Sequence, residues 1–252
     1  MKDSMKRFGT DYGGFYYPKD LPGLTSSSVI YCFGAGEDIS HDVALAHATG
    51  APVHIFDPTP RAITHVELTQ KVLETQTLIT SNKRYGGGDI NYWPFILEHS
   101  VSPSQLVLHP YGLFTKDDHA MKFYLPSNTD YVSCSLMEGM KGTTFIEVPV
   151  KTLRTCMTEL GHSQIDLLKM DIEGCECDVL DAMLNDNIYP RYLSVDFDLG
   201  WTGEKVQDKP RCRAIMERLL RSGYKLLHYK DANFSFQFTE PPLQKLTTPS
   251  HQ

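Results

Sequence analysis

The sequence has 252 residues, a formal net charge of −7 at neutral pH, and 41% hydrophobic residues. This length suffices for one large α/β domain, or two small ones, with a fully buried core. The negative charge argues against a general nucleic-acid binder, which needs a basic face. No stretch approaches the roughly 20 apolar residues of a membrane span. The first residues also lack the apolar core of a secretory signal.

The cysteines and histidines do not suggest a structural metal site or a disulfide framework. The six cysteines stand at positions 32, 134, 156, 175, 177 and 212, a spacing that fits neither arrangement. The ten histidines form no i, i+4 pair with a third ligand nearby. We therefore expect reduced, buried thiols and a cytoplasmic protein.

The N-terminal arm, residues 1–28, gives no clear periodic signal. Its stretch 8–22 is rich in glycine, tyrosine and proline. Two interpretations remain open for it. The arm either lies across the mouth of a site, with its aromatic rings as a cover, or packs on the edge of the domain.

The stretch after the arm predicts a strand, a glycine turn and a helix in succession. Val29–Phe33 are apolar and β-branched or aromatic, as in a strand that is buried on both faces. Gly34 and Gly36 allow a sharp turn and let the backbone approach a ligand closely. Ile39–Thr49 predicts a helix that Gly50 ends. This succession opens a nucleotide-type βαβ site, although such turns also occur for structural reasons alone.

The second strand brings an acid to the same predicted site. Val53–Phe56 is a short buried strand, and Asp57 stands at its end. Asp57 follows Gly36 by about the distance at which βαβ sites place a carboxylate against ribose hydroxyls. The alternative is a turn aspartate before Pro58. Thr59 is a suitable cap for the helix that follows.

The middle of the chain is less regular. The segment 81–104 predicts a long irregular connection with three successive glycines and a tryptophan, a composition typical of lids and substrate loops. The predicted elements after it are strands at Leu106–His109, Met121–Leu125 and Phe145–Val148, the last two around the polar stretch 127–141, and a helix at Lys151–Leu160.

Two acids follow the next buried strand, Ile165–Met170. They stand in the run Asp171-Ile172-Glu173-Gly174, ahead of a predicted helix at Cys175–Leu184. Acids near a helix N-terminus gain about 0.3–1 kcal/mol from the dipole. That gain does not explain an acid at the carboxyl end of a strand, where open α/β sheets bind ligands. We therefore favour a functional role for Asp171 and leave both interpretations open for Glu173.

The C-terminal part completes a predicted α/β fold. It comprises a strand at Tyr192–Phe197, a helix at Lys209–Ser222, a hairpin of Tyr224–Tyr229 with Phe234–Phe238, and a loose tail over 239–252. The alternation of strands and helices predicts a largely parallel twisted sheet with helices on both faces. The hairpin makes its last strand antiparallel. Without repeats or a linker-like break, we expect residues 1–252 to form a single domain.

Several blocks match a known family in order. They are Phe8-Gly9, Tyr12-Gly13-Gly14, Tyr31 to Asp42, Phe56 to Ala62, His109-Pro110-Tyr111-Gly112 and Leu168-Lys169-Met170-Asp171-Ile172-Glu173-Gly174-Cys175-Glu176. On these blocks the chain resembles the FkbM family of S-adenosylmethionine-dependent methyltransferases. The resemblance implies a Rossmann-like class I methyltransferase fold and O-methylation of a sugar or glycoconjugate hydroxyl. Val195-Asp196-Phe197-Asp198 departs from the Val-Glu-Phe-His that the family often carries.

The resemblance also implies roles for single residues. Asp171 would take the proton of the acceptor hydroxyl, and His109 and His228 are weaker candidates for that step. The acceptor would be a small molecule or a glycan. The implied cofactor-binding residues are Gly34, Ala35, Gly36, Glu37, Asp57, Pro58, Thr59, Tyr111, Gly112 and Asp171.

The acceptor side carries further acids and two tryptophans. The implied substrate-binding residues are Glu173, Asp196, Asp198, Trp201 and Trp93. Trp93 and Trp201, both expected in glycine-containing loops, either stack on a sugar ring or pack at the rim. Asp171 with Asp196 or Asp198 offers oxygen ligands for a divalent metal such as Mg²⁺ or Mn²⁺. The alternative is that these acids bind acceptor hydroxyls without a metal.

Two other functions are compatible with the same succession of strand, glycine turn and helix. An NAD(P)-dependent oxidoreductase usually carries a third glycine in its fingerprint, and here Ile39 takes that position. A non-catalytic module that only binds S-adenosylmethionine is the other alternative. The presence of the glycine turn together with Asp57 and Asp171 argues against that module.

Overall fold

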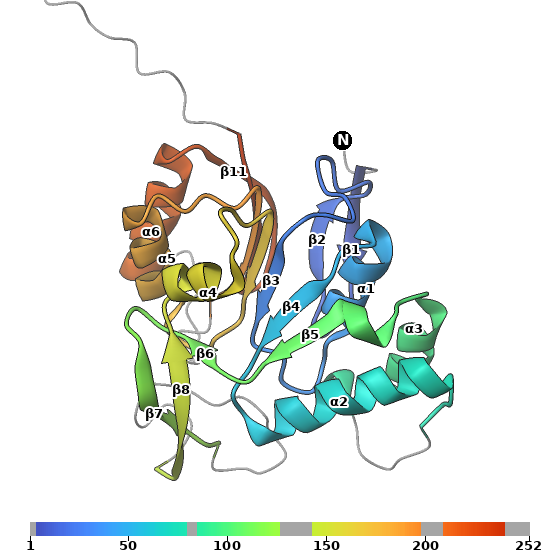
Figure 1. Cartoon of the computed structure of the whole chain (residues 1–252). Helices are drawn as coiled ribbons and strands as arrows, with labels where there is room; N and C mark the ends of the chain where they lie inside the picture. The colour runs from blue at the N-terminus through green and yellow to red at the C-terminus, as the bar shows by residue number, and fades with distance from the viewer. Residues whose placement is uncertain (1–3, 80–84, 127–142, 198–208, 240–252) are drawn as a thin grey trace, which may run out of the picture.

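A mostly parallel sheet forms the centre of the molecule (Figure 1). The computed structural model describes residues 4–79, 85–126, 143–197 and 209–239. Its seven-stranded sheet has the order β11-β12-β10-β9-β3-β4-β5. β12 is antiparallel to both neighbours, and every other neighbouring pair is parallel. The strands are β3 (Ile30–Phe33), β4 (Val53–Phe56), β5 (Leu106–His109), β9 (Leu167–Met170), β10 (Tyr192–Asp196), β11 (Tyr224–Lys230) and β12 (Asn233–Phe238).

Helices cover both faces of this sheet, as the sequence predicts (Figure 1). In β3, Ile30 and Cys32 point into one apolar core, while Tyr31 and Phe33 point into the other. This alternation explains why the strand is apolar at every position. One core is covered by α1 (Ser40–Thr49), α2 (Pro60–Thr75) and α3 (Tyr92–Glu98), and the other by α4 (Leu153–Leu160), α5 (Glu176–Asn185) and α6 (Pro210–Arg221).

The ends of the first two helices follow the sequence signals. Gly50 ends α1 in the left-handed conformation, with φ 72°. Thr59 is the N-cap of α2, and Pro60 is its first residue. The hydroxyl of Thr59 does not cap the helix, because it donates to Asp57 instead.

The N-terminal arm is more regular than expected. It forms an antiparallel hairpin of β1 (Met5–Phe8) and β2 (Phe15–Pro18). Phe8, Phe15 and Tyr17 are buried, and the hairpin contacts α1, β11 and β12. The interpretation of an arm packed on the domain edge is therefore confirmed for its two strands.

The expectation of an irregular connection over 81–104 is wrong in part. Residues 92–98 form α3, so Trp93 lies in a helix and not in a loop. Its ring packs against His65, Tyr85 and Tyr92, and only 7% of the residue is exposed. This burial places the Trp93 side chain in the core beneath α1 and α2.

A small second sheet lies beside the main one (Figure 1). It has the order β6-β8-β7, made of Gly112–Leu113, Phe145–Lys151 and Asp118–Tyr124. β7 and β8 correspond to the two strands predicted around 127–141, and they are antiparallel. That polar stretch and nearly all of the predicted tail lie outside the described residues. Among the residues described, no helix is both long and apolar enough to cross a bilayer.

Candidate functional site

The order of the strands puts a switch point, where open α/β sheets form their ligand crevice, at the carboxyl ends of β3 and β9. From β3 the chain proceeds to β4 and β5 on one side, whereas β9 leads to β10 on the other. Neighbouring connections therefore diverge at the carboxyl ends of β3 and β9. Open α/β sheets bind ligands at such switch points. Gly34 and Asp171 directly follow these two strands, whose last residues, Phe33 and Met170, are paired.

The two loops that start at this point touch each other. Gly34 has φ +83°, and a Cβ placed on it would overlap the carbonyl oxygen of Asp171. The backbone N–H of Asp171 donates to the Phe33 carbonyl at 3.1 Å. Glycine is required at position 34 because both the backbone conformation and the close approach exclude a side chain.

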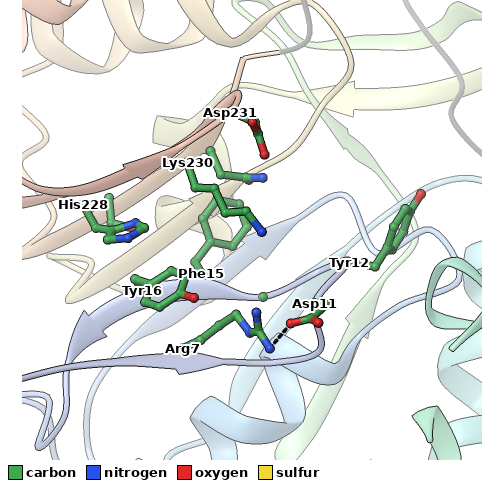
Figure 2. A pocket seen from close by; sticks show the side chains of 11 residues that line it. Arg7, Asp11, Tyr12, Phe15, Tyr16, His228, Lys230 and Asp231 are labelled. Carbon is green, nitrogen blue, oxygen red and sulfur yellow. Dashed lines mark ion pairs between the residues drawn. The ribbon is translucent and has the colours of Figure 1, made fainter.

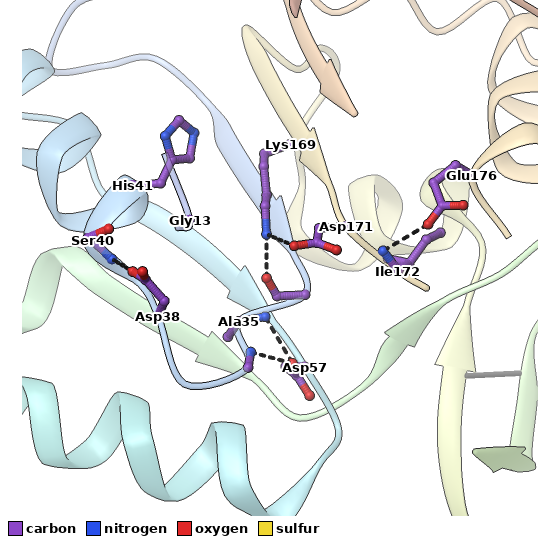
Figure 3. A network of polar contacts seen from close by, with 12 residues as sticks. Gly13, Ala35, Asp38, Ser40, His41, Asp57, Lys169, Asp171, Ile172 and Glu176 are labelled. Atoms are coloured by element: carbon purple, nitrogen blue, oxygen red, sulfur yellow. Dashed lines mark hydrogen bonds and ion pairs between the residues drawn. The ribbon is translucent and has the colours of Figure 1, made fainter. Parts of the chain in front are cut away.

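Asp57 holds the glycine turn from the other side (Figure 3). Its Oδ2 accepts the backbone N–H groups of Ala35 and Gly36, at 2.9 and 3.1 Å. Its Oδ1 accepts the N–H and the hydroxyl of Thr59, at 2.9 and 2.7 Å. A carboxylate has about four acceptor positions. Asp57 therefore fixes the turn here, and its contact with a ribose stays a prediction.

Glu37 is also engaged by the protein itself. Arg61 donates Nε–H to Oε1 at 3.1 Å and a terminal N–H to Oε2 at 2.8 Å, which is the bidentate arrangement. Glu37 is 7% exposed, so the pair is largely shielded from solvent. It joins the glycine turn to α2.

Lys169 is a site residue that the sequence analysis did not single out. It is 4% exposed within an otherwise apolar strand. Its Nζ donates to the Gly34 carbonyl at 2.5 Å and lies 3.6 Å from Oδ2 of Asp171 (Figure 3). Burial would lower the pKa of Lys169, but the charges of Asp171 and Asp42 outweigh it, so the pKa is raised. The ammonium therefore ties the glycine turn to Asp171.

Glu176 shapes the loop after Asp171. It is fully buried, and its carboxylate accepts the N–H groups of Ile172 and Gly174, at 3.2 and 3.0 Å. Burial raises its pKa well above the usual range. Glu173 between them has φ +60°, a conformation that non-glycine residues adopt mostly at constrained or functional positions. The loop is thus held in one shape with Asp171 at its start.

The tip of the N-terminal hairpin reaches the same site. Thr10 donates its hydroxyl to Oδ2 of Asp38 at 2.6 Å, and Oδ1 accepts the N–H of Ser40 at 2.8 Å. Burial raises the pKa of Asp38 despite these bonds. The hairpin is therefore bonded to the segment that follows the glycine turn.

Tyr12, at this tip, lies close to the acids of the site. Its pKa is raised, first by partial burial and then by the negative charges of Asp171 and Glu173, although 60% of the residue is exposed. A Cβ on Gly87 would overlap the Tyr12 ring, so the ring rests on this glycine. The interpretation of an arm across the site mouth therefore agrees with the position of its tip.

The structure does not bring His109 to Asp171. Residues Met170, Phe33, Phe56 and His109 are paired across four neighbouring strands, which separates the outer two backbones by about 14 Å. A ring nitrogen of His109 lies 2.9 Å from one of His54, and burial lowers the pKa of His109. The two residues therefore cannot act on the same proton, and a catalytic role for His109 beside Asp171 has no geometric support.

The region around His109 belongs to the far end of the crevice. Tyr111 is 9% exposed and packs against Phe56, at 5.5 Å between ring centroids. Gly112 lies near Pro58, with a built Cβ 3.6 Å from its Cγ. The predicted cofactor residues thus form a row from Asp171 through the glycine turn to Pro58 and Gly112.

The other residues singled out from the sequence lie in different parts of the chain. Asp196 ends β10, next to β9, and its charge adds to the raised pKa values of Tyr12 and Lys169. Asp198 and Trp201 lie outside the described residues. His228 stacks on Tyr16 in the C-terminal hairpin, at 4.0 Å between centroids. Within the described part of the chain, no group of three or more His, Cys, Asp or Glu side chains is arranged to hold a metal ion.

Comparisons with known proteins agree with this architecture. Residues 36–226 match the model of the methyltransferase FkbM domain. The chain is also similar to a rat protein (Rattus norvegicus) described as "Probable methyltransferase-like protein 24", with 26% identity over 216 residues. That match covers 82% of this chain but 44% of the relative, so the chain spans less than half of that protein's length. No solved structure matches.

The matched region contains the glycine turn from Gly36 onward, Asp57 and the whole loop from Asp171 to Glu176. It therefore includes most of the polar contacts that hold the crevice between β3 and β9. The chain belongs to the family of proteins with a methyltransferase FkbM domain.

Proposed function

We propose that the protein is an S-adenosylmethionine-dependent O-methyltransferase that acts on a sugar or glycoconjugate hydroxyl. The observation that supports this most is the contact between the Gly34 turn and Asp171 at the switch point. This contact supports the proposal because it brings the start of the Asp171 loop against the glycine turn. We propose that the acceptor is a small molecule or a glycan.

The row of residues from Asp171 to Gly112 fits the proposed donor. The close contact of Gly34 with the Asp171 backbone holds the two loops together at the centre of the row. Asp171 and Glu173 supply negative charge at one end, and the aromatic residues near Tyr111 supply an apolar surface at the other. S-adenosylmethionine supplies an activated methyl group on a positively charged sulfur, so negative charge near that methyl is favourable.

Asp171 is the acid best placed to act as a base. The carboxylates of Asp57 and Glu37 are both taken up by the protein. Asp171 is different, because its side chain is 36% exposed and only Oδ2 lies near Lys169. Lys169 orients the carboxylate and leaves Oδ1 for the proton of an acceptor hydroxyl. We propose that Asp171 takes this proton as the oxygen attacks.

Replacement of Asp171 tests both parts of the proposal. Asp171→Asn keeps the size of the side chain but removes the base, so kcat should fall by about 10²–10⁴-fold. The dissociation constant for S-adenosylhomocysteine should change little, because the glycine turn is intact. Methyl transfer from labelled donor is measured on a panel of rhamnosides, other sugars and phenols, with and without EDTA. Calorimetry measures donor binding.

The exposed acid Glu67 of α2 provides the matched control, since Glu67→Gln removes a charge far from the crevice. If the Asp171→Asn variant turned over as fast as the parent, Asp171 would not be the base. Titration with NADH separates the main alternative: tight binding of NADH without any response to S-adenosylhomocysteine would indicate an oxidoreductase. Donor binding without turnover on any acceptor would indicate a binding module.

A further inference from the structure

A cavity lies between the N-terminal and the C-terminal β-hairpins that the structure describes. It has a volume of about 200 Å³ and opens between the β1–β2 hairpin and the β11–β12 hairpin (Figure 2). Pockets for drug-sized ligands usually measure about 300–1,000 Å³. This cavity therefore fits one small chemical group and not a long chain. Its lining includes the side chains of Arg7, Tyr16, His228, Lys230, Asn233 and Ser235.

The cavity is on the same edge of the sheet as Asp171. Asn233, at the start of β12, is paired with Asp196 at the end of β10. β10 is in turn paired with β9, with Val195 opposite Met170. Two strand spacings, about 10 Å, therefore separate the cavity wall from Asp171. A molecule of one or two sugar units spans this distance.

Two cationic side chains enter the cavity from opposite walls. Figure 2 shows Arg7 on β1 and Lys230 on β11 extending toward the space between the hairpins. Within the described part of the chain, Lys230 has no ion pair within 4 Å. Nε of Arg7 is buried and lacks a hydrogen-bond partner. A buried donor without a partner costs about 1–3 kcal/mol, so this nitrogen favours an incoming acceptor.

The two acids at the cavity do not satisfy these cations. Asp11 forms an ion pair with a terminal nitrogen of Arg7, but its side chain is 80% exposed. Such surface pairs contribute about 0–1 kcal/mol and give way to a bidentate anion on the guanidinium. Asp231 sits in the tight turn of the C-terminal hairpin, with φ 55°, and is not within ion-pair distance of Lys230.

An aromatic surface completes the cavity. The rings of Tyr16 and His228 are stacked, with their planes 23° apart. Burial and the charge of Lys230 lower the pKa of His228, so its imidazole is neutral at pH 7. Asn233 and Ser235 add neutral hydrogen-bonding groups. These features suit a ring-shaped ligand with hydroxyls and one negatively charged substituent.

We propose that this cavity binds a carboxylate or phosphate group of the methyl acceptor through Arg7 and Lys230. The acceptor's anionic end lies between the hairpins, and its reactive hydroxyl lies about 10 Å away at Asp171. That the anion is part of a methyl acceptor rests on the proposed function. Binding of an anion in this cavity does not depend on methyl transfer. The assignment makes the acceptor an acidic molecule, such as a uronate or a sugar phosphate.

Binding of defined probes to the full chain tests the assignment. Calorimetry or NMR titration is carried out with D-glucuronate, glucose 6-phosphate, inorganic phosphate and neutral D-glucose. We expect the anionic probes to bind at least 10-fold more tightly than glucose, and added NaCl to weaken them. Whether glucuronate or glucose 6-phosphate binds better distinguishes a carboxylate from a phosphate. Arg7→Gln and Lys230→Gln should each weaken anion binding 10-fold or more.

Matched controls come from the same two strands. Lys6→Gln on β1 and Lys225→Gln on β11 remove exposed charges that do not line the cavity, and they should change anion binding less than twofold. Equal binding of glucose and the anions, or equal effects of control and cavity variants, would overturn the assignment. Titration with S-adenosylhomocysteine is measured on the same samples. If S-adenosylhomocysteine does not bind while the anions still do, only the proposed function is contradicted.

Discussion

The glycine turn and the cavity between the hairpins use their polar groups in opposite ways. At the turn, the carboxylate of Asp57 is bonded to several groups of the protein, and in the adjoining loop Glu176 is bonded in the same way. In the cavity, a buried nitrogen of Arg7 has no partner. Saturated groups fix the shape of the chain, whereas unsatisfied groups leave capacity for a ligand. The comparison separates residues that build the crevice from residues that bind in it.

The largest expected effect comes from breaking the network of the turn at its buried cation. Lys169→Met removes the ammonium that is bonded to the Gly34 carbonyl and paired with Asp171, and it also removes the positive charge that favours the buried carboxylate of Asp42. Loss of one partner of a buried ion pair costs about 3–5 kcal/mol. We expect the free energy of unfolding, measured by urea denaturation, to fall by this amount.

A second substitution sharpens that test. Asp42→Asn removes the uncompensated charge, so the double variant should recover part of the stability lost in Lys169→Met. The exposed Lys225→Met serves as the control and should change stability by less than about 0.5 kcal/mol. A loss below about 1 kcal/mol in Lys169→Met would contradict a central role for this lysine.

The next effect concerns the close approach of the two loops. Gly34→Ala should cost about 3 kcal/mol, because the new Cβ meets the backbone of Asp171 and forces one of the loops to move. Gly161 at the end of α4 is a matched control. It also has positive φ, but a Cβ there has no neighbour within 4 Å. Gly161→Ala should therefore cost only about 1–2 kcal/mol.

Denaturation and binding of S-adenosylhomocysteine are measured on both alanine variants. We expect Gly34→Ala to lose donor binding under conditions where the protein is still folded, and Gly161→Ala to retain it. Equal costs for the two substitutions would mean that the loops are free to separate.

The smallest effect is a pH dependence that links the N-terminal hairpin to α1. The Nδ1–H of His41 donates to the Phe8 carbonyl at 2.9 Å, and Nε2 of the neutral ring accepts the hydroxyl of Tyr17 at 3.3 Å. Burial lowers the pKa of His41 to about 3. The unfolded chain takes up the proton near pH 6.5, and the folded chain does so only near pH 3. The free energy of unfolding therefore falls as the pH decreases through this window, by about 2 kcal/mol between pH 6.5 and 5.

His41→Gln removes this contribution while keeping hydrogen-bonding groups. Urea denaturation at several pH values should show a shallower slope for the variant than for the parent. His54, whose pKa is also lowered by burial, to about 4, remains in both proteins and leaves a residual slope. Parallel curves for the two proteins would show that His41 does not remain neutral in the folded state.

The sequence predicts the strands and most of the helices because their apolar residues recur at the periods of buried elements. It misses α3, since Trp93-Pro94 looks like a break. Proline is tolerated in the first turn of a helix, where its missing N–H is not needed, and α3 begins at Tyr92. The hairpin of the arm is missed because its strands are stabilised by distant partners, such as Tyr192 against Tyr17.

The sequence predicts which acids lie at the site, but it does not predict which of them bind the protein itself and which stay accessible to a ligand. The sequence identifies Asp57 and Asp171 from their positions after strands. It cannot reveal that Asp57 is occupied by the turn while Asp171 retains an exposed oxygen, because both facts depend on the folded backbone. A lysine inside an apolar, buried strand is a sequence signal of a site residue, and Lys169 carries it.

The packing of β2 against β11 and β12 has a consequence for how the protein is made. Thr10 and Tyr12 lie at the candidate site on a hairpin that packs against strands much later in the sequence. During synthesis these strands leave the ribosome long after the glycine turn. The nascent chain therefore cannot complete this candidate site before β11 and β12 have been synthesised and have packed against β2.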